Sequence, residues 1–375
     1  MSAPAGPAPT GRPTRILVDL LFCTGTRGGM ESVARHLYGA MTPDMLADVQ
    51  LVALASRELA ATDTSWFPGR VIDSRIASSG RLGWALGEQI VGFVAARLGA
   101  DVVHCPANFG PAVSPVPVAL TIHDLISFRF PEYVPGRLAG LQRGLLRAGA
   151  RAARRVLTVS AATAADLVHY LHLPPAKVQV VHPAGSGRPA RDTPRRTDLL
   201  FSLGNRMPHK NFVGLLEALA LIDPARRPRL LISGGGDNDP LAAEVDRLGL
   251  GDRVELAGWV PADEIDRWYA EATLLVFPTL FEGFGLPVLE AMSAGCPVLC
   301  TDLPVLHEVG GDAATYVDSR DPQALADAIV ALLDDPQERA RLSAAGIVRA
   351  AEFSWERTAR QTLATLRATA RPRRA

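Results

Sequence analysis

The sequence predicts an α/β protein with two domains, each built on a doubly wound parallel sheet. Three observations support this fold class. The chain has 375 residues, which is too long for one ordinary hydrophobic core. Short apolar runs alternate with amphipathic segments, as strands alternate with crossover helices in a parallel sheet. A polar segment rich in Pro, Gly and Arg at residues 183–194 interrupts this pattern, which then starts again.

In the first half, the strands are predicted from apolar runs and the helices from apolar residues at helical spacing. The predicted strands are residues 15–22, 49–55, 101–104, 116–122, 156–159 and 178–181. The predicted helices are residues 30–41, 81–98, 137–151 and 161–171. A glycine-rich loop at residues 23–29 joins the first strand to the first helix.

The same alternation continues in the second half. The predicted strands are residues 199–203, 229–233, 254–256, 273–277 and 297–300. The predicted helices are residues 212–221, 241–248, 262–270, 322–333, 336–351 and 355–369. We therefore expect a tail at residues 1–14, a first domain at 15–183, a linker at 184–197 and a second domain at 198–353.

The composition excludes several classes of protein. Hydrophobic residues make up 48% of the chain and charged residues 21%, as in a globular protein. The 39 basic and 39 acidic residues balance, which gives no reason to expect nucleic-acid binding. Four scattered cysteines argue against a disulfide framework and favour the cytoplasm. No long uncharged apolar run predicts a transmembrane helix, and the N-terminal tail is expected to be disordered rather than a signal peptide.

The most informative segment follows the strand predicted to end at Phe277. Ligands of open α/β sheets bind at the carboxyl ends of strands, so Glu282 and Glu290 lie where a ligand is expected. Gly283 and Gly285 let the backbone adopt a positive φ or approach a ligand closely. The helix that starts behind them would present free N–H groups to an anion. An anion cradle with two carboxylates suits a phosphorylated, sugar-like ligand.

Two further polar segments also follow predicted strands. Arg206 and Lys210 lie between a strand and a helix, where they would meet a diphosphate through charge-assisted hydrogen bonds. A charged helix start without a ligand is the alternative. His123 and Asp124 follow the strand at residues 116–122, where they would make polar contacts or act as an acid/base group. A single His in this setting is more often a buried, hydrogen-bonded residue.

Two weaker signals lie in the first half. Gly28 and Gly29 would let the loop after the first strand approach a phosphate or an acceptor, next to a helix N-terminus. Ser160 follows another strand, where it either only caps the next helix or also contributes to the ligand site.

These segments together resemble the retaining glycosyltransferases of family 4 (glycosyltransferase group 1), which have the GT-B fold. Glu282 and Glu290 match the paired-glutamate motif of that family, and the likeness extends over residues 15–366. Residues 204–211, GNRMPHKN, resemble the mannosyltransferase-like subgroup. The family usually places its Arg five residues before the Lys, where this chain has Asn205.

The resemblance implies two Rossmann-like domains facing each other across a cleft. The first would bind the acceptor and the second the nucleotide sugar, and a last helix at residues 354–370 would cross back to the first domain. The implied reaction is hexosyl transfer with retention of configuration, most simply mannosyl transfer from GDP-mannose. A glycan, a lipid-linked or a small-molecule acceptor is implied, in the biosynthesis of a cell-surface polysaccharide.

The site residues carried over by resemblance fall into three groups. The predicted catalytic residues are Glu282, His123, Arg206 and Lys210. The predicted donor-binding residues are Glu290, Gly283, Phe284, Gly285, Leu286, Gly28, Gly29, Ser233, Gly234, Trp259 and Val260. Asp124 and Ser160 are expected on the acceptor side. The resemblance implies that Glu282 binds hydroxyls of the donor sugar and that Glu290 binds hydroxyls of the ribose. We expect no cofactor and no metal, because the cations and the helix start would stabilise the leaving diphosphate.

Residues 137–155 carry arginines and no acidic residue, with leucines between them. Such a segment either contacts anionic lipid at the inner face of the membrane or exposes a basic face to water. Other functions stay open: a sugar-nucleotide epimerase or a sugar phosphorylase on a similar fold, a natural-product glycosyltransferase, or a catalytically silent sugar-nucleotide-binding protein. The richness in Ala, Arg, Gly and Pro suggests a bacterium of high genomic GC content.

Overall fold

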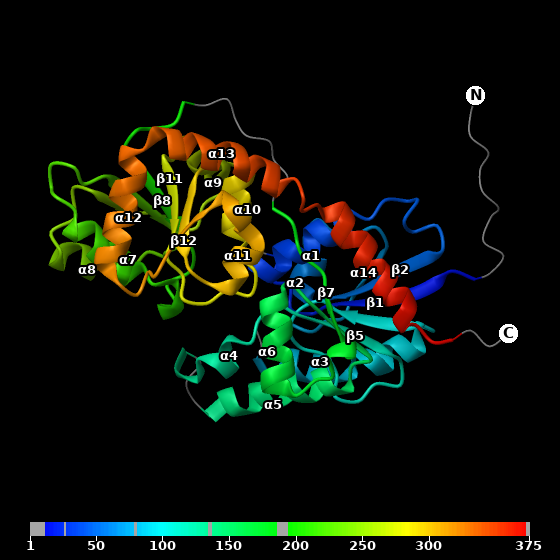
Figure 1. The fold of residues 1–375 in the computed structure, drawn as a ribbon. Coiled ribbons are helices and arrows are strands. Elements are labelled where there is room, and N and C mark those ends of the chain that lie inside the picture. Colours follow the sequence, from blue (N-terminus) through cyan, green and yellow to red (C-terminus); the bar gives the residue numbers. More distant parts are fainter. Residues whose placement is uncertain (1–11, 26–27, 79–80, 134–136, 186–193, 373–375) are drawn as a thin grey trace, which may run out of the picture. The chain divides into compact units, whose positions relative to one another are not determined.

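Two parallel sheets organise the chain, one in each of two units (Figure 1). The structure, a computed structural model, describes residues 12–25, 28–78, 81–133, 137–185 and 194–372, without the side chains of residues 81–86 and 137–138. The first unit comprises residues up to Pro183 together with those from Trp355 onward, and the second comprises Ala184–Ser354. Most of the predicted N-terminal tail and the middle of the predicted linker lie outside the described residues.

The sheet of the first unit has seven parallel strands in the order β3-β2-β1-β4-β5-β6-β7. Their bounds are β1 Thr14–Leu20, β2 Val49–Ala55, β3 Arg70–Asp73, β4 Val102–Cys105, β5 Val118–Ile122, β6 Arg155–Thr158 and β7 Val178–Val180. The central strands are nearly continuous runs of buried residues, as expected when helices cover both faces of a sheet.

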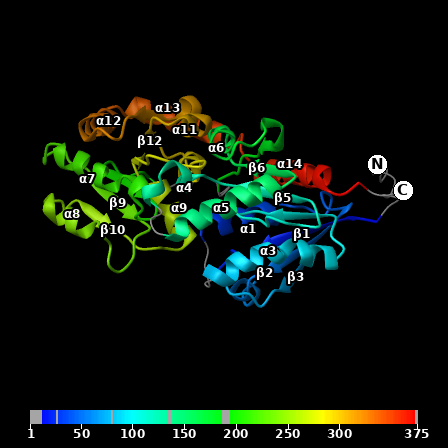
Figure 2. The same cartoon turned by 90° about the horizontal axis from the view of Figure 1, so that it is seen from below.

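Helices cover both faces of this first sheet. Their bounds are α1 Gly29–Gly39, α2 Arg57–Ala60, α3 Arg81–Arg97, α4 Ile126–Arg129, α5 Arg137–Ala152, α6 Ala161–Leu171 and α14 Trp355–Thr369, with single 3-10 turns at Pro131–Tyr133 and Pro175–Lys177. One face packs against α1 and α14, and the other against α3, α5 and α6 (Figure 1, Figure 2).

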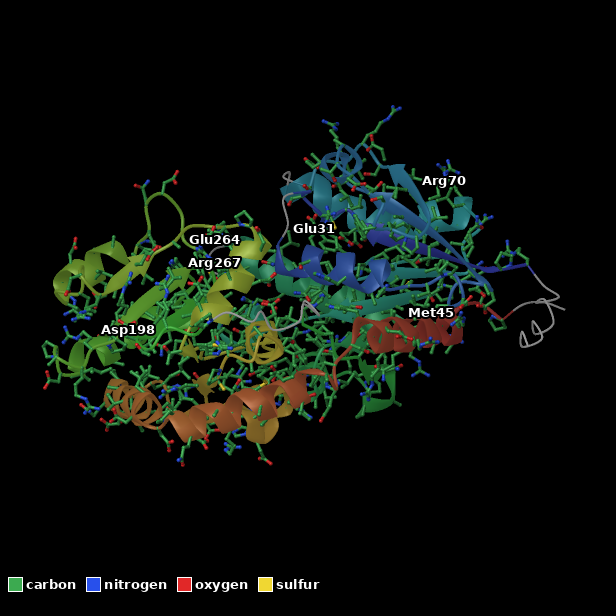
Figure 3. The ribbon with its side chains drawn as sticks, turned by 90° about the horizontal axis from the view of Figure 1, so that it is seen from above. Glu31, Met45, Arg70, Asp198, Glu264 and Arg267 are labelled. Carbon is green, nitrogen blue, oxygen red and sulfur yellow. The ribbon has the colours of Figure 1, made fainter. Side chains whose placement is uncertain are left out.

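The C-terminal helix α14 is an integral part of the first unit. Leu363 and Leu366 are fully buried in the same core cluster as Leu37 of α1. The Arg367 guanidinium donates to the Met45 carbonyl at 2.8 Å and pairs with Asp48 at 2.5 Å (Figure 3). The chain thus returns to its first unit after building the second.

The sheet of the second unit has six parallel strands in the order β10-β9-β8-β11-β12-β13. The strands are β8 Leu199–Leu203, β9 Arg229–Ser233, β10 Val254–Leu256, β11 Leu274–Phe277, β12 Val298–Thr301 and β13 Thr315–Val317. The helices are α7 Phe212–Leu221, α8 Ala242–Arg247, α9 Ala262–Glu271, α10 Leu286–Ser293, α11 Pro304–Gly310, α12 Pro322–Asp334 and α13 Pro336–Ala350, with 3-10 turns at Pro208–Lys210 and Gly311–Ala313.

Both sheets have the doubly wound topology that the sequence predicts. In each, the strand order reverses beside the first strand, between β1 and β4 in one unit and between β8 and β11 in the other. The loops that leave two such strands at their carboxyl ends diverge to opposite faces, which opens a crevice where ligands bind in this class of sheet.

The elements missed from the sequence lie mainly at the sheet edges. β3 and β13 are edge strands of four and three residues without a fully buried position, so they lack the apolar run that marks a buried strand. The short helices α2, α4 and α11 were also not predicted. Two predicted strands start later than expected, at Val118 and Val298, directly after Pro117 and Pro297. Proline has no N–H group for the ladder, which explains both shifts.

A buried carboxyl group in the first unit makes stability depend on pH. Asp19, Glu88 and Cys105 are all buried, and their side chains lie within 4.8 Å of one another. Burial raises the pKa of Asp19 above its ordinary value of 3.8, and hydrogen bonds from Glu88, Leu21 and Cys105 only partly offset this.

A raised pKa in the folded state means that the stability contributed by protonated Asp19 is complete below pH 3.8 and is lost as the pH rises through the folded value. We expect Asp19→Asn to remove this loss, so that its free energy of unfolding falls less than that of the wild type as the pH rises above 3.8. Denaturant titrations across this range measure the difference, with Asp318→Asn at an exposed position as the control. Parallel curves for wild type and Asp19→Asn would contradict the prediction.

Candidate active site

Lys210 and Glu282 form an ion pair at the carboxyl ends of β8 and β11. Lys210 Nζ lies 2.5 Å from Glu282 Oε1, and each side chain is 14% exposed. Their two loops are joined because the Leu280 N–H donates to the His209 carbonyl at 2.6 Å, and so does the Thr279 hydroxyl at 3.2 Å. Two of the four predicted catalytic residues therefore lie together, beside the point where the strand order reverses.

A neutral histidine adjoins this ion pair. Burial lowers the pKa of His209 to about 4, and the neighbouring Lys210 charge adds to the effect. His209 is thus uncharged at neutral pH, so it adds no positive charge beside Lys210.

The start of α10 follows directly after Glu282. Gly285 has a φ of 105°, which only glycine adopts readily, and a Cβ placed there would lie 2.7 Å from Leu306. Leu286 begins the helix, so its N-terminus points out of the same loop. Phe284 is buried against the Phe353 ring, which gives it a packing role. Gly283 lies between these residues and is half-buried.

Glu290 lies within α10 and is held by a tyrosine from α9. The Tyr269 hydroxyl donates to Glu290 Oε2 at 3.1 Å. Burial, and then the nearby Glu290 charge, raise the pKa of Tyr269, so its hydroxyl stays protonated and able to donate. This bond orients one carboxylate oxygen of Glu290, the residue that the resemblance predicts to bind the ribose.

The loops after β9 and β10 form an adjoining wall in the same unit. The Gly234 N–H donates to the Gly258 carbonyl at 3.2 Å, and the Ser233 hydroxyl to the same carbonyl at 3.3 Å. Trp259 is 74% exposed, and Val260 is half-buried beside it. A large exposed aromatic ring at the end of a strand is available to a planar ligand group.

Arg206 lies in the loop after β8, next to this wall, and its guanidinium is engaged within the chain. It forms a bidentate pair with Asp239, and each side chain is 9% exposed. In this geometry the guanidinium that was predicted to contact a diphosphate is bound to a carboxylate of the chain, as the Lys210 ammonium is to Glu282.

In the first unit, His123 follows β5 with its ring fixed. Its Nε2 lies 2.8 Å from the Pro106 carbonyl, which requires Nε2–H to donate and leaves Nδ1 as the acceptor. Burial lowers the pKa of His123, so the ring is neutral at neutral pH. The His123 N–H donates to Asn108 at 2.7 Å. Asp124 accepts the Ile126 N–H at 3.1 Å and so caps the turn that follows.

Of the weaker sequence signals, Ser160 has a structural role, whereas Gly28 and Gly29 have none in packing. Ser160 is fully buried and accepts the Thr163 N–H as the N-cap of α6. Gly28 and Gly29 are exposed, and no described atom lies within 4 Å of a Cβ placed at either, so packing within the described chain does not require glycine there.

A carboxylate of the chain already lies at the loop before α1. Glu31 is buried, accepts the Thr24 and Gly25 N–H groups at 2.8 Å and 3.2 Å, and pairs with Arg35 (Figure 3). An anion predicted at the N-terminus of α1 would therefore have a negative neighbour in Glu31.

Two further features of the described residues concern metals and membranes. Within the described residues, the His, Cys, Asp and Glu side chains close enough to share a metal ion are the buried Asp19, Glu88 and Cys105 of the first unit. None of the helices in the described part of the chain combines the length and the apolar character needed to span a membrane.

The sequence missed the partners of two site residues. Asp239 pairs with Arg206, and Tyr269 holds Glu290. For Arg206, the sequence did contain an indication of its partner, because an acidic residue follows the glycine run at residues 234–236. Tyr269 gave no such signal, because a tyrosine within an amphipathic helix is normally part of the core.

Family models match both halves of the chain. The model described as "Glycosyl transferases group 1" matches residues 188–349, and the model described as "Glycosyltransferase Family 4" matches residues 27–184. An O-antigen chain mannosyltransferase B from Escherichia coli is 33% identical over 259 residues, covering 65% of this chain and 68% of that protein. A D-inositol 3-phosphate glycosyltransferase from Frankia alni is 33% identical over 311 residues, covering 76% of this chain and 72% of that protein.

Solved structures share the fold. A sucrose-phosphate synthase from Thermosynechococcus elongatus superimposes with a TM-score of 0.76 at 20% identity, covering 95% of this chain and 98% of that one. A protein from Anabaena, solved in complex with UDP and glucose, has a TM-score of 0.72 at 18% identity, covering 95% of this chain and all of that one (100%). With the paired carboxylates and the two doubly wound sheets, these matches identify the chain as a GT-B glycosyltransferase of group 1, family 4, similar to the mannosyltransferases of that family.

Proposed function

We propose that the chain transfers a hexosyl residue, with mannosyl from GDP-mannose as the leading candidate, from a nucleotide sugar and with retention of configuration. The observation that carries this proposal is the Lys210–Glu282 pair beside the start of α10. It combines a cation and a helix N-terminus for a diphosphate with a carboxylate for sugar hydroxyls.

Each part of the second unit has a role in this proposal. Lys210 and the first N–H groups of α10 stabilise the charge that develops on the leaving diphosphate. Glu282 exchanges its bond to Lys210 for hydroxyls of the donor sugar. Glu290, oriented by Tyr269, accepts the ribose hydroxyls, and Trp259 with Val260 meets the base.

We assign neither glutamate as a nucleophile. Glu282 instead accepts hydroxyls of the donor sugar, and Glu290 is held by Tyr269. Retention then follows from departure and attack on the same face of the sugar, with the leaving diphosphate taking the proton of the acceptor hydroxyl. The neutral His123 ring of the first unit can offer a polar contact but no positive charge.

The names of the relatives favour a sugar acceptor. The Escherichia coli relative is an O-antigen chain mannosyltransferase, which supports a polysaccharide or its lipid-linked precursor as acceptor. The Frankia alni relative is named for an inositol phosphate, so a small phosphorylated polyol is the second candidate.

Product analysis tests the proposed reaction. The protein is incubated with GDP-mannose, UDP-glucose or UDP-N-acetylglucosamine and a panel of alkyl hexosides and inositol phosphate, and products are identified by NMR. The proposal predicts a nucleoside diphosphate and a glycoside with the anomeric configuration of the donor. An epimerised donor would indicate an epimerase, a sugar phosphate would indicate a phosphorylase, and an inverted glycoside would contradict retention.

We further propose that transfer needs no metal ion, because Lys210 and α10 supply the positive charge at the diphosphate. Adding EDTA to the assay is therefore expected to leave at least about half of the initial rate. Removal of a catalytic metal would instead cost several kcal/mol of transition-state stabilisation, and the rate would be almost completely lost. The control is a matched sample with added Mg²⁺. Complete loss with EDTA, restored by Mg²⁺, would contradict this mechanism.

We also propose that the outer side of α3 and α5 contacts anionic lipid, which would place the protein at the inner face of the cell membrane. The two helices lie side by side on one face of the first sheet (Figure 2). Ile90, Phe93 and Leu141 are 48%, 51% and 58% exposed, and α5 carries arginines without an acid. Apolar and basic side chains together favour an anionic bilayer surface.

Replacing Arg147 and Arg151 with Gln is expected to weaken binding to vesicles of phosphatidylcholine and phosphatidylglycerol by at least about tenfold, since each basic residue near the surface contributes about 1 kcal/mol. Sedimentation with vesicles measures this. Arg226→Gln, in the second unit, is the control. Equal binding of the double variant and the wild type, or equal binding to pure phosphatidylcholine, would contradict lipid contact.

A further inference from the structure

Arg206 uses all of its hydrogen-bonding capacity within the chain. A guanidinium has five N–H donors. Its Nε lies 2.9 Å and 3.0 Å from the two Asp239 oxygens, and Nη2 donates to Asp239 Oδ2 at 2.7 Å and to the Ile232 carbonyl at 3.3 Å. Nη1 donates to the Gly204 and Ser233 carbonyls at 3.0 Å and 3.1 Å. No N–H of this side chain is left for a diphosphate.

The pair is also enclosed. Both side chains are 9% exposed, and the guanidinium lies 5.1 Å from the centre of the Phe212 ring. Burial tends to raise the pKa of Asp239, but the hydrogen bonds and charge of Arg206 outweigh it and hold that pKa below its usual range. A Cβ at Gly235 would lie 2.1 Å from Asp239 Oδ2 and 2.8 Å from Arg206 Nη2. The glycine thus makes room for the ion pair.

The carbonyls that Arg206 binds are the ends of two strands. Gly204 follows β8, while Ile232 and Ser233 end β9. The Gly204 N–H donates to the Ser233 carbonyl at 3.1 Å. Gly234 has a φ of 97°, and a Cβ there would lie 2.5 Å from the Gly204 carbonyl oxygen. The two loops are therefore in direct backbone contact, with Arg206 bridging them.

The loop after β8 carries Lys210, and the wall it meets carries Trp259. The Gly235 N–H donates to the Ala257 carbonyl at 3.2 Å, which extends the bridge to the loop after β10. The Arg206–Asp239 pair thus holds the loop that carries Lys210 against the loops after β9 and β10, which are predicted to bind the nucleotide. Arg206, paired with the Asp239 carboxylate, can organise the site without contacting the ligand.

We propose that Arg206 and Asp239 form a positioning pair, which holds the loop of residues 204–211 so that Lys210 meets the diphosphate. The inference rests on the proposed function in one respect, namely that Lys210 binds a diphosphate. It assigns Asp239 a role in donor binding and removes Arg206 from the groups that contact the donor.

Asp239→Asn is the deciding variant, because it keeps the shape of the side chain while it releases Arg206. A positioning pair predicts an approximately tenfold weaker affinity for GDP or UDP by calorimetry and a higher KM for the donor, with a lower kcat as well, because Lys210 also stabilises the leaving diphosphate. If Arg206 contacted the diphosphate itself, releasing it would leave the affinity unchanged or tighten it, which would overturn the proposal. Arg206→Lys, which keeps the charge but not the bidentate geometry, is expected to behave like Asp239→Asn.

A second measurement does not depend on any nucleotide. Deuterium uptake should accelerate in peptides spanning residues 203–211 and 232–240 of both variants and stay unchanged in β12. Asp334→Asn, at the exposed Arg226–Asp334 pair of the same unit, is the matched control. Unchanged uptake in both peptides would overturn the positioning role. A wild type that binds neither GDP nor UDP would count against the proposed function alone, since the uptake experiment still decides the role of the pair.

Discussion

Replacing Glu282 with Gln is expected to lower the rate of glycosyl transfer by roughly 100-fold while the fold stays intact. Hydrogen bonds to a charged group contribute about 1.5–3 kcal/mol, and each 1.4 kcal/mol is a factor of ten in rate. The carboxylate lies 2.5 Å from Lys210 and is 14% exposed, so the ion pair fixes its position. Glu282→Ala should abolish transfer, because it also removes the side-chain oxygens that accept the hydroxyls of the donor sugar.

The affinity for the nucleoside diphosphate shows whether this loss of rate comes from weaker donor binding or from slower transfer. Because Glu282 occupies Lys210, its removal frees the cation, so the affinity of Glu282→Gln for GDP or UDP should stay equal or rise while turnover falls. Glu264→Gln is the control, since Glu264 lies on α9 of the same unit and pairs with Arg267 near the surface (Figure 3). Near-normal turnover of Glu282→Gln would remove the central role of this carboxylate.

Replacing Lys210 with Ala is expected to weaken binding of the nucleoside diphosphate by about 10-fold to 100-fold. A charge-assisted bond to phosphate contributes about 1.5–3 kcal/mol, and Lys210 is the cation that the loop after β8 directs toward the start of α10. Calorimetric titration of the variant measures the change. Lys177→Ala, at the other lysine of the chain, is the control, because Lys177 lies in the first unit and donates to the Arg151 carbonyl. Unchanged diphosphate affinity in Lys210→Ala would contradict the phosphate role.

The fold could be predicted from the sequence where apolar runs are buried on both sides. The strands at residues 49–55, 199–203 and 229–233 have the predicted bounds. β3 and β13 were missed because an edge strand pairs on one side only and need not be apolar. Strand order, and with it the place where the order reverses, follows from how the helices cross over the sheet, which a linear pattern does not encode.

The candidate site could be predicted where one short segment carries the chemistry. The loop from Phe281 to Gly285 and the start of α10 lie as expected, because Gly285 and Pro287 mark the helix start in the sequence itself. Arg206 shows the limit of this approach. A basic residue near Lys210 suggested a second phosphate ligand, but Asp239, 33 positions further along, pairs with it instead. Contacts between loops of different strands appear only when the sheet brings those loops together.

The two carboxylates also differ more than their spacing suggested. Glu282 lies on a loop and pairs with the long side chain of Lys210. Glu290 lies within a helix and accepts a hydrogen bond from the buried Tyr269. The first contact therefore joins two loops, whereas the second joins two helices, α9 and α10. This difference supports the division of roles in which Glu282 serves the reacting sugar and Glu290 the ribose.

Titration of the wild-type protein with a nucleoside diphosphate and with the monophosphate of the same base tests the central claim most directly. The claim is that Lys210 and the start of α10 form a diphosphate site beside Glu282. It predicts that GDP or UDP binds at least about tenfold tighter than GMP or UMP, because the second phosphate gains a charge-assisted bond, and that this preference disappears in Lys210→Ala. Equal affinity of the wild type for the diphosphate and the monophosphate would contradict it.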